Sequence, residues 1–238
     1  MFFFSSGFEE RSTHLFNQFE PDPQKSVVLG FNDDRDTLSR RKNDQTFESR
    51  GFAISVFERH TGYLEFIAKV LSSTSQRIGT ERPMKIFVDY STMTRAWYSH
   101  LLTWAKYAAM HPHIELLMFY SCGKYERDFE ALQISELSVV PGYEGHSAGA
   151  RRTHALLGLG FDKYATLSVC DQLEPDSITC FIAKEQPDDT SASHVISENR
   201  EVIDISNSDP VPLPLTNVSA AFRIMHEYAS LYGGDDAI

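Results

Sequence analysis

Carboxyl, hydroxyl and guanidinium side chains gather in one short stretch near the middle of the chain. Residues 85–95 read KIFVDYSTMTR, so Asp89, Ser91 and Arg95 accompany a run of apolar and β-favouring residues. This pattern predicts a strand, a tight turn and the start of a helix. In a parallel sheet such a junction lies at the carboxyl edge, where hydroxyls and free N–H groups can face a ligand. The stretch therefore predicts a binding site, without a motif that names a reaction.

Two further segments have the same order of an apolar strand, a serine and then an arginine. They are residues 2–11, FFFSSGFEER, and residues 118–127, MFYSCGKYER. If the strands are parallel, all three strand ends meet at one sheet edge, where arginines either clamp phosphate or pair with carboxylates inside the fold. Serine and aspartate are also common helix caps, so a purely structural role is the alternative. The ligand-binding residues predicted from these segments are Ser5, Ser6, Gly7, Arg11, Asp89, Ser91, Arg95 and Ser121.

A separate candidate is the loop at residues 141–147, PGYEGHS. Gly142 and Gly145 allow the backbone to approach a ligand closely, so both join the predicted ligand-binding residues. Glu144 and His146 offer a carboxylate and an imidazole together, which is a combination suited to proton transfer. They form the predicted catalytic pair if the protein turns over a substrate. A surface turn is the alternative interpretation of this loop.

Several familiar chemistries lack their motifs. The sequence contains no GxGxxG fingerprint, P-loop, HExxH or GxSxG elbow, so standard nicotinamide binding, P-loop hydrolysis and α/β-hydrolase chemistry are not expected. Cys122, Cys170 and Cys180 have no CxxC spacing and are interpreted as buried thiols in a reducing compartment, with a metal or redox role as the alternative. No metal site is predicted, and the sequence leaves the cofactor unknown.

Composition limits the classes of partner. The chain has 238 residues, of which 42% are hydrophobic and 23% charged, as is usual for a globular protein. Its net charge of −11 would repel a nucleic-acid backbone. No apolar run approaches the roughly 18 to 20 residues of a membrane helix, and the opening segment has no basic leader. We therefore expect a cytoplasmic protein that binds neither nucleic acid nor membrane.

Apolar runs alternate with amphipathic segments along the chain, which predicts an α/β, Rossmann-like fold with a mostly parallel sheet flanked by helices. We expect a single domain over residues 1–238. The charged segment at residues 32–50 is predicted to be an exposed insertion; a flap that carries basic residues towards an anion is the alternative. Predicted strands cover residues 2–4, 25–31, 51–56, 85–90, 113–120, 137–140, 178–183 and 202–205, and predicted helices cover residues 9–19, 61–72, 96–109, 151–157, 163–173, 191–199 and 219–231.

The predicted helix at residues 96–109 is apolar nearly all round. Such a helix packs between the sheet and another surface, which could belong to a second subunit. This gives the alternative function of a non-catalytic assembly or regulatory subunit. The partner, a second copy or another protein, would dock through the helix around Trp97 and Trp104.

The chain resembles a set of uncharacterised bacterial Rossmann-like proteins. The resemblance rests on SSGFEERS at residues 5–12, VDYSTMTR at 88–95, PGYEG at 141–145 and LGFD at 159–162, and it spans most of the chain. It implies the fold and the grouping of the motifs, and it suggests bacterial defence or nucleotide signalling without supplying an activity. We expect a module that binds a nucleotide or another phosphorylated small molecule at the strand-end edge.

Overall fold

The computed structural model describes residues 1–32, 35–58, 62–78, 83–108, 114–123, 138–145, 152–184 and 189–232. Contacts between Cα atoms group the chain into two compact units. Unit 1 comprises Met1–Glu126 with Val139–Glu144, and unit 2 comprises Arg127–Ser138 with Gly145–Ile238. The single domain that we expected stays a prediction.

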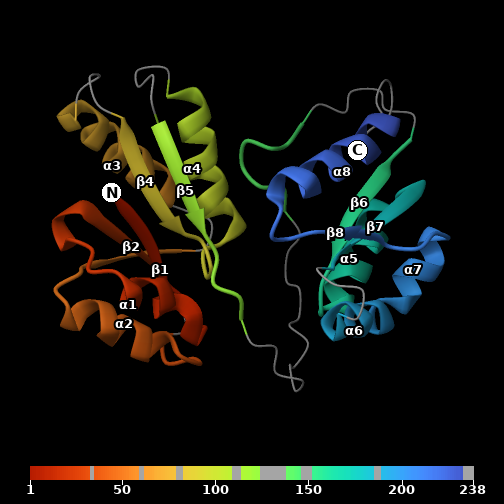
Figure 1. Ribbon diagram of the computed structural model, residues 1–238, viewed down its shortest axis with the longest axis horizontal. Helices are drawn as coiled ribbons and strands as arrows, with labels where there is room; N and C mark the ends of the chain where they lie inside the picture. The colour runs from red at the N-terminus through yellow and green to blue at the C-terminus, as the bar shows by residue number, and fades with distance from the viewer. Residues whose placement is uncertain are drawn as a thin grey trace. The chain divides into compact units, whose positions relative to one another are not determined.

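Unit 1 is built on a five-stranded, all-parallel sheet with the strand order β3-β2-β1-β4-β5 (Figure 1). The order reverses between β1 and β4, which is the arrangement of a Rossmann-like sheet. The predicted α/β fold is therefore confirmed. The strands are β1 (Phe2–Ser6), β2 (Ser26–Phe31), β3 (Ile54–Phe57), β4 (Met84–Asp89) and β5 (Ile114–Phe119).

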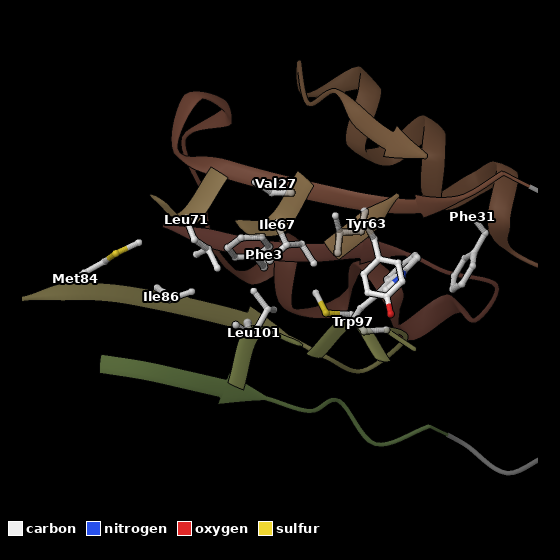
Figure 2. Packing of buried hydrophobic residues seen from close by; sticks show 13 residues of the cluster. Phe3, Val27, Phe31, Tyr63, Ile67, Leu71, Met84, Ile86, Trp97 and Leu101 are labelled. Atoms are coloured by element: carbon white, nitrogen blue, oxygen red, sulfur yellow. The ribbon is translucent and has the colours of Figure 1, made fainter. Parts of the chain in front are cut away.

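Helices cover the two faces of this sheet. One face carries the 3-10 helix η1 (Glu10–Thr13), α1 (His14–Gln18) and α2 (Arg40–Ser49), and the short 3-10 helix η2 (Pro23–Lys25) leads into β2. The other face carries α3 (Tyr63–Ile78) and α4 (Arg95–Tyr107). Successive residues of a strand point to opposite faces, so the fully buried Phe3 and Phe4 enter different cores. Figure 2 shows Phe3 among Ile67, Leu71, Trp97 and Leu101.

The segment at residues 32–50 is not an exposed insertion throughout. It contains α2, in which Arg40, Asn43 and Phe47 are 0%, 1% and 0% exposed. These residues are spaced three and four apart, so they lie on one helix face, which packs on the sheet. The prediction of exposure was wrong for this helix because two of its three buried positions are occupied by arginine and asparagine.

Unit 2 has a three-stranded parallel sheet with the order β6-β7-β8. Its core lies between this sheet and the helices α5 to α7, and includes Cys180, Val195 and Val202. The strands are β6 (His154–Leu159), β7 (Ser177–Ala183) and β8 (Val211–Leu213), and the helices are α5 (Lys163–Leu173), α6 (Thr190–Glu198), α7 (Arg200–Ser206) and α8 (Val218–Leu231).

Three assignments in the second half of the chain were wrong. The predicted helix at 151–157 overlaps strand β6, and the predicted strand at 202–205 lies in helix α7. The described part of the predicted strand at 137–140 has no strand structure. Short apolar runs fit either a buried strand or one face of a helix, so tertiary packing decides between them. None of the described helices combines the length and the apolar character that a membrane span requires.

Candidate functional site

The carboxyl ends of β1 and β4 bring several predicted site residues together. Ser5, Ser6, Asp89 and Ser91 are 2%, 0%, 4% and 5% exposed. They lie where the strand order reverses, which is where open α/β sheets bind ligands. The sequence therefore identified the residues at this edge, and their hydrogen bonds decide which of them a ligand can reach.

The loops after β1 and β4 are in direct contact. The Ser5 hydroxyl lies 3.0 Å from both the carbonyl oxygen and the hydroxyl of Thr92. A Cβ atom added to Gly7 would lie only 2.6 Å from the Cβ of Thr92. Glycine at position 7 thus permits the two loops to touch, and the Ser5 hydroxyl serves that contact.

Aromatic rings pack beside this contact, at the end of β2. Phe8 stacks on Phe31 at 5.1 Å between ring centroids, and Phe31 stacks on Trp97 at 4.7 Å. Trp97 is completely buried. Together with the contact between Gly7 and Thr92, these rings pack protein atoms on the β2 side of the strand-order reversal.

Ser6 joins β1 to α2 through a buried ion pair. Its hydroxyl donates to Asp44 Oδ1 at 2.6 Å, and Arg40 Nε donates to the same oxygen at 2.8 Å. Both terminal nitrogens of Arg40 are buried and have no hydrogen-bond partner among the described residues. A Cβ atom at Gly30 would lie 2.7 Å from one of these nitrogens, so glycine makes room for the guanidinium. Ser6 thus has a structural partner.

Asp89 connects the ends of β4 and β5. Its Oδ1 accepts hydrogen bonds from the backbone N–H and the hydroxyl of Ser91, and the Ser91 oxygen accepts from the Ser121 N–H at 2.7 Å. The second oxygen, Oδ2, is buried and has no hydrogen-bond partner among the described residues. Burial raises the pKa of the Asp89 carboxyl, against the opposing effects of the Ser91 hydrogen bonds and the Arg11 and His14 charges.

Arg11 holds the loop that follows β5. Its Nε and one terminal nitrogen donate to the two carboxylate oxygens of Glu9 at 2.8 and 2.9 Å, and its other terminal nitrogen donates to the Ser121 carbonyl at 2.8 Å. The guanidinium also lies 4.9 Å from the centre of the Tyr120 ring. All three nitrogens are therefore engaged, and Arg11 positions Ser121 instead of offering a free phosphate clamp.

A pocket of about 370 Å³ lies between α1 and the end of β5. Asp89 pairs in register with Phe119, so both side chains point to the face of the sheet on which α1 lies. The imidazole Nε2 of His14 lies 2.9 Å from the side-chain nitrogen of Gln18. The residues that line the pocket are His14, Leu15, Gln18, Phe119, Tyr120, Ser121 and Cys122.

Sequence reasoning found Ser121 but missed the other polar residues of the pocket. His14 and Gln18 are four residues apart and therefore share one helix face, which is the signal that could have revealed them. Cys122 was predicted to be a buried thiol, which was wrong, because its side chain is exposed. Its position directly after an apolar strand matches that of the serines, which is the signal that could have identified it.

The loop at residues 141–145 has its own internal geometry. Gly142 and Gly145 have φ angles of 87° and 65°, which favour glycine. The Gly142 N–H donates to Glu144 Oε1 at 2.9 Å, and this bond lowers the pKa of the exposed Glu144 carboxyl. The Tyr143 hydroxyl lies 3.3 Å from the Thr103 hydroxyl, in the second half of α4. This loop is therefore not joined to Asp89 by any described contact.

The four remaining predicted residues lie in α4 or outside the described part of the chain. Arg95 is exposed at the first position of α4, where the Thr94 hydroxyl accepts from the Trp97 N–H at 3.2 Å. His146 lies outside the described residues, so its pairing with Glu144 stays a prediction. Trp97 is completely buried and Trp104 packs partly buried against the same core, so Trp97 belongs to the core of unit 1, and the docking of a partner through this helix stays a prediction.

The part of the chain that the structure describes has no group of three or more His, Cys, Asp or Glu side chains placed to hold a metal ion. Comparisons with protein-family models, with curated proteins and with solved structures find no match.

Proposed function

We propose that this chain is a Rossmann-like module that binds a nucleotide or another phosphorylated small molecule at the carboxyl edge of the unit 1 sheet. The observation that carries the proposal is the pocket beside Asp89, bounded by α1 and the loop after β5. Parallel sheets with this strand order bind ligands at this edge. The β2 side of the edge is filled by Phe8, Phe31 and Trp97, so the β5 side is the favoured location.

The side chains of the pocket suit a ligand with both a flat and a polar part. Phe119 and the half-exposed Tyr120 provide rings against which a base or a sugar can pack. The exposed imidazole of His14 and the hydroxyl of Ser121 provide hydrogen-bond donors for a phosphoryl group. Arg95 remains a second candidate for the phosphoryl group, because it is exposed at the start of α4.

A thermal-shift screen against nucleotides, sugar phosphates and cyclic nucleotides tests the proposal. A ligand present at about 100 times its dissociation constant stabilises the protein by about 2.7 kcal/mol. The variant Cys122→Trp places a large ring in the pocket and is expected to remove this stabilisation. Leu102→Trp is the matched control, because it adds the same ring to an exposed position of α4 on the other face of the sheet.

The variants also locate the site. If a ligand stabilises Cys122→Trp as much as the wild type, the ligand binds outside this pocket. If the stabilisation is lost in Arg95→Ala, the phosphoryl group binds at the start of α4. A wild-type protein that no compound stabilises, even at millimolar concentration, would contradict the proposal.

The resemblance to bacterial Rossmann-like proteins supports a role in bacterial defence or nucleotide signalling, and the composition supports a cytoplasmic location. We propose this role and this location together with the binding function. Ligand turnover would be expected to involve Glu144 and His146, and a Glu144→Gln variant that turns over the ligand at the wild-type rate would exclude Glu144 from that role.

A second candidate function is that of an assembly or regulatory subunit, and α8 of unit 2 favours it. Val218, Phe222 and Met225 are 75%, 68% and 42% exposed, and their spacing places them on one stripe of the helix. Sedimentation of the wild type and of Phe222→Glu tests for self-association through this stripe. Ser219→Glu adds the same charge to the same helix as a control. A wild-type protein that sediments as a monomer at all concentrations would argue against self-association.

A further inference from the structure

We infer that Asp89 accepts a hydrogen bond from a hydroxyl group of the bound ligand, so that the ligand is a sugar phosphate or a nucleotide and not a simple phosphate. This inference rests on the proposed function and names the ligand class for the same pocket. It assigns Asp89 as the residue that determines specificity.

One carboxylate oxygen of Asp89 is available for a hydrogen bond from a ligand. Oδ1 has two donors from Ser91, whereas Oδ2 is buried without any hydrogen-bond partner among the described residues. A buried polar atom without a partner destabilises a fold, and such atoms are concentrated where a ligand supplies the missing group. A hydroxyl group of a ligand would supply the missing hydrogen bond to Oδ2.

Asp89 lies next to the pocket. Its side chain shares the α1 face of the sheet with Phe119, which lines the pocket. Ser121, also a lining residue, is linked to Asp89 through the Ser91 hydroxyl. Because protein atoms cover Oδ2, we expect Ser121 and Cys122 to shift when the ligand enters.

The charges around Asp89 decide the class of group that it can receive. A carboxylate repels a phosphoryl group, and the nearby Arg11 is already paired with Glu9 through two hydrogen bonds. The phosphoryl group is therefore expected on the outer side of the pocket, where the His14 imidazole is exposed. The part of the ligand at Asp89 then carries a donor, as a sugar hydroxyl does.

The experiment compares two phosphates by titration calorimetry. Ribose 5-phosphate carries sugar hydroxyls, whereas n-propyl phosphate carries the same phosphoryl group without them. The proteins are the wild type, Asp89→Asn and the control Asp22→Asn, in which an exposed carboxylate far along the chain is changed in the same way. In Asp89→Asn the amide oxygen keeps the Ser91 donors, so the amide N–H₂ replaces Oδ2 and cannot accept from a ligand.

We expect the wild type and Asp22→Asn to bind ribose 5-phosphate roughly 10- to 100-fold more tightly than n-propyl phosphate, which is the effect of a hydrogen bond to a charged group. Asp89→Asn is expected to bind both compounds with the weaker affinity. Equal binding of the two compounds by the wild type would overturn the inference even if Asp89→Asn did not fold, while leaving the proposed function in place. Unchanged discrimination in a folded Asp89→Asn would also overturn it, and a wild type that binds neither compound would overturn it together with the proposed function at this pocket.

Discussion

Gly7→Ala is the substitution that tests most directly whether the loops after β1 and β4 are in contact. The added methyl carbon would lie 2.6 Å from the Cβ and 2.7 Å from the hydroxyl oxygen of Thr92. The φ angle of Gly7 is not in the left-handed region, so the expected effect is steric and not conformational. Overpacking of this kind typically costs about 1–3 kcal/mol of unfolding free energy.

Urea denaturation followed by circular dichroism measures this cost, and Gly123→Ala provides the matched control. Gly123 is also in unit 1, has no left-handed φ angle, and its added Cβ would meet its nearest neighbour at 3.4 Å, an ordinary contact. Its variant is expected to be neutral within about 0.5 kcal/mol, as is usual for surface changes.

A double-mutant cycle isolates the contact between the two loops. Thr92→Gly removes the two side-chain atoms that lie nearest to the new methyl group and leaves the Thr92 carbonyl oxygen at 3.3 Å, so Gly7→Ala should lose most of its cost in that background. The expected coupling energy is most of the overpacking cost of about 1–3 kcal/mol. A Gly7→Ala variant as stable as the wild type, or a cost that persists unchanged after Thr92→Gly, would refute the reasoning that the loops close this part of the edge.

Three further predictions concern stability. Phe47→Ala should lower the free energy of unfolding by about 3–5 kcal/mol, because Phe47 is completely buried against the Phe16 ring. Gln45→Ala, at an exposed position of the same helix, should change it little. Equal effects of the two variants in chemical denaturation would contradict the packing of α2. Burial raises the pKa of the Asp89 carboxyl above its ordinary value of 3.8, so the free energy of unfolding should fall as the pH rises from 3.8 through the raised pKa. Denaturation of Asp89→Asn at the same pH values should not show this fall. Identical pH profiles of the wild type and the variant would contradict the prediction. Arg11→Ala should lower the free energy of unfolding by about 1.5–3 kcal/mol, because the Arg11 guanidinium donates hydrogen bonds to Glu9 and to the loop after β5. An unchanged midpoint in urea denaturation would show that the loop is stable without Arg11.

The strand ends and the fold class could be predicted because their signals are local. Phe2, Phe3 and Phe4 in succession indicate a strand buried on both faces, and the structure places Phe3 and Phe4 in opposite cores. The order of polar residues after each apolar run likewise indicated which residues reach the carboxyl edge. Asp89, Ser91 and Ser121 do meet there.

Tertiary structure alone decided what those residues do at the edge. Whether a serine hydroxyl is free depends on partners distant in the chain: Thr92 for Ser5, Asp44 for Ser6 and Ser121 for Ser91. The same holds for α2, since its mixed charges favour exposure in the sequence, yet Arg40 is buried beside Gly30. Hydrophobic periodicity reports the local chain, whereas the pairing of polar groups depends on which strands become neighbours, and strand order is set by the packing of the whole sheet.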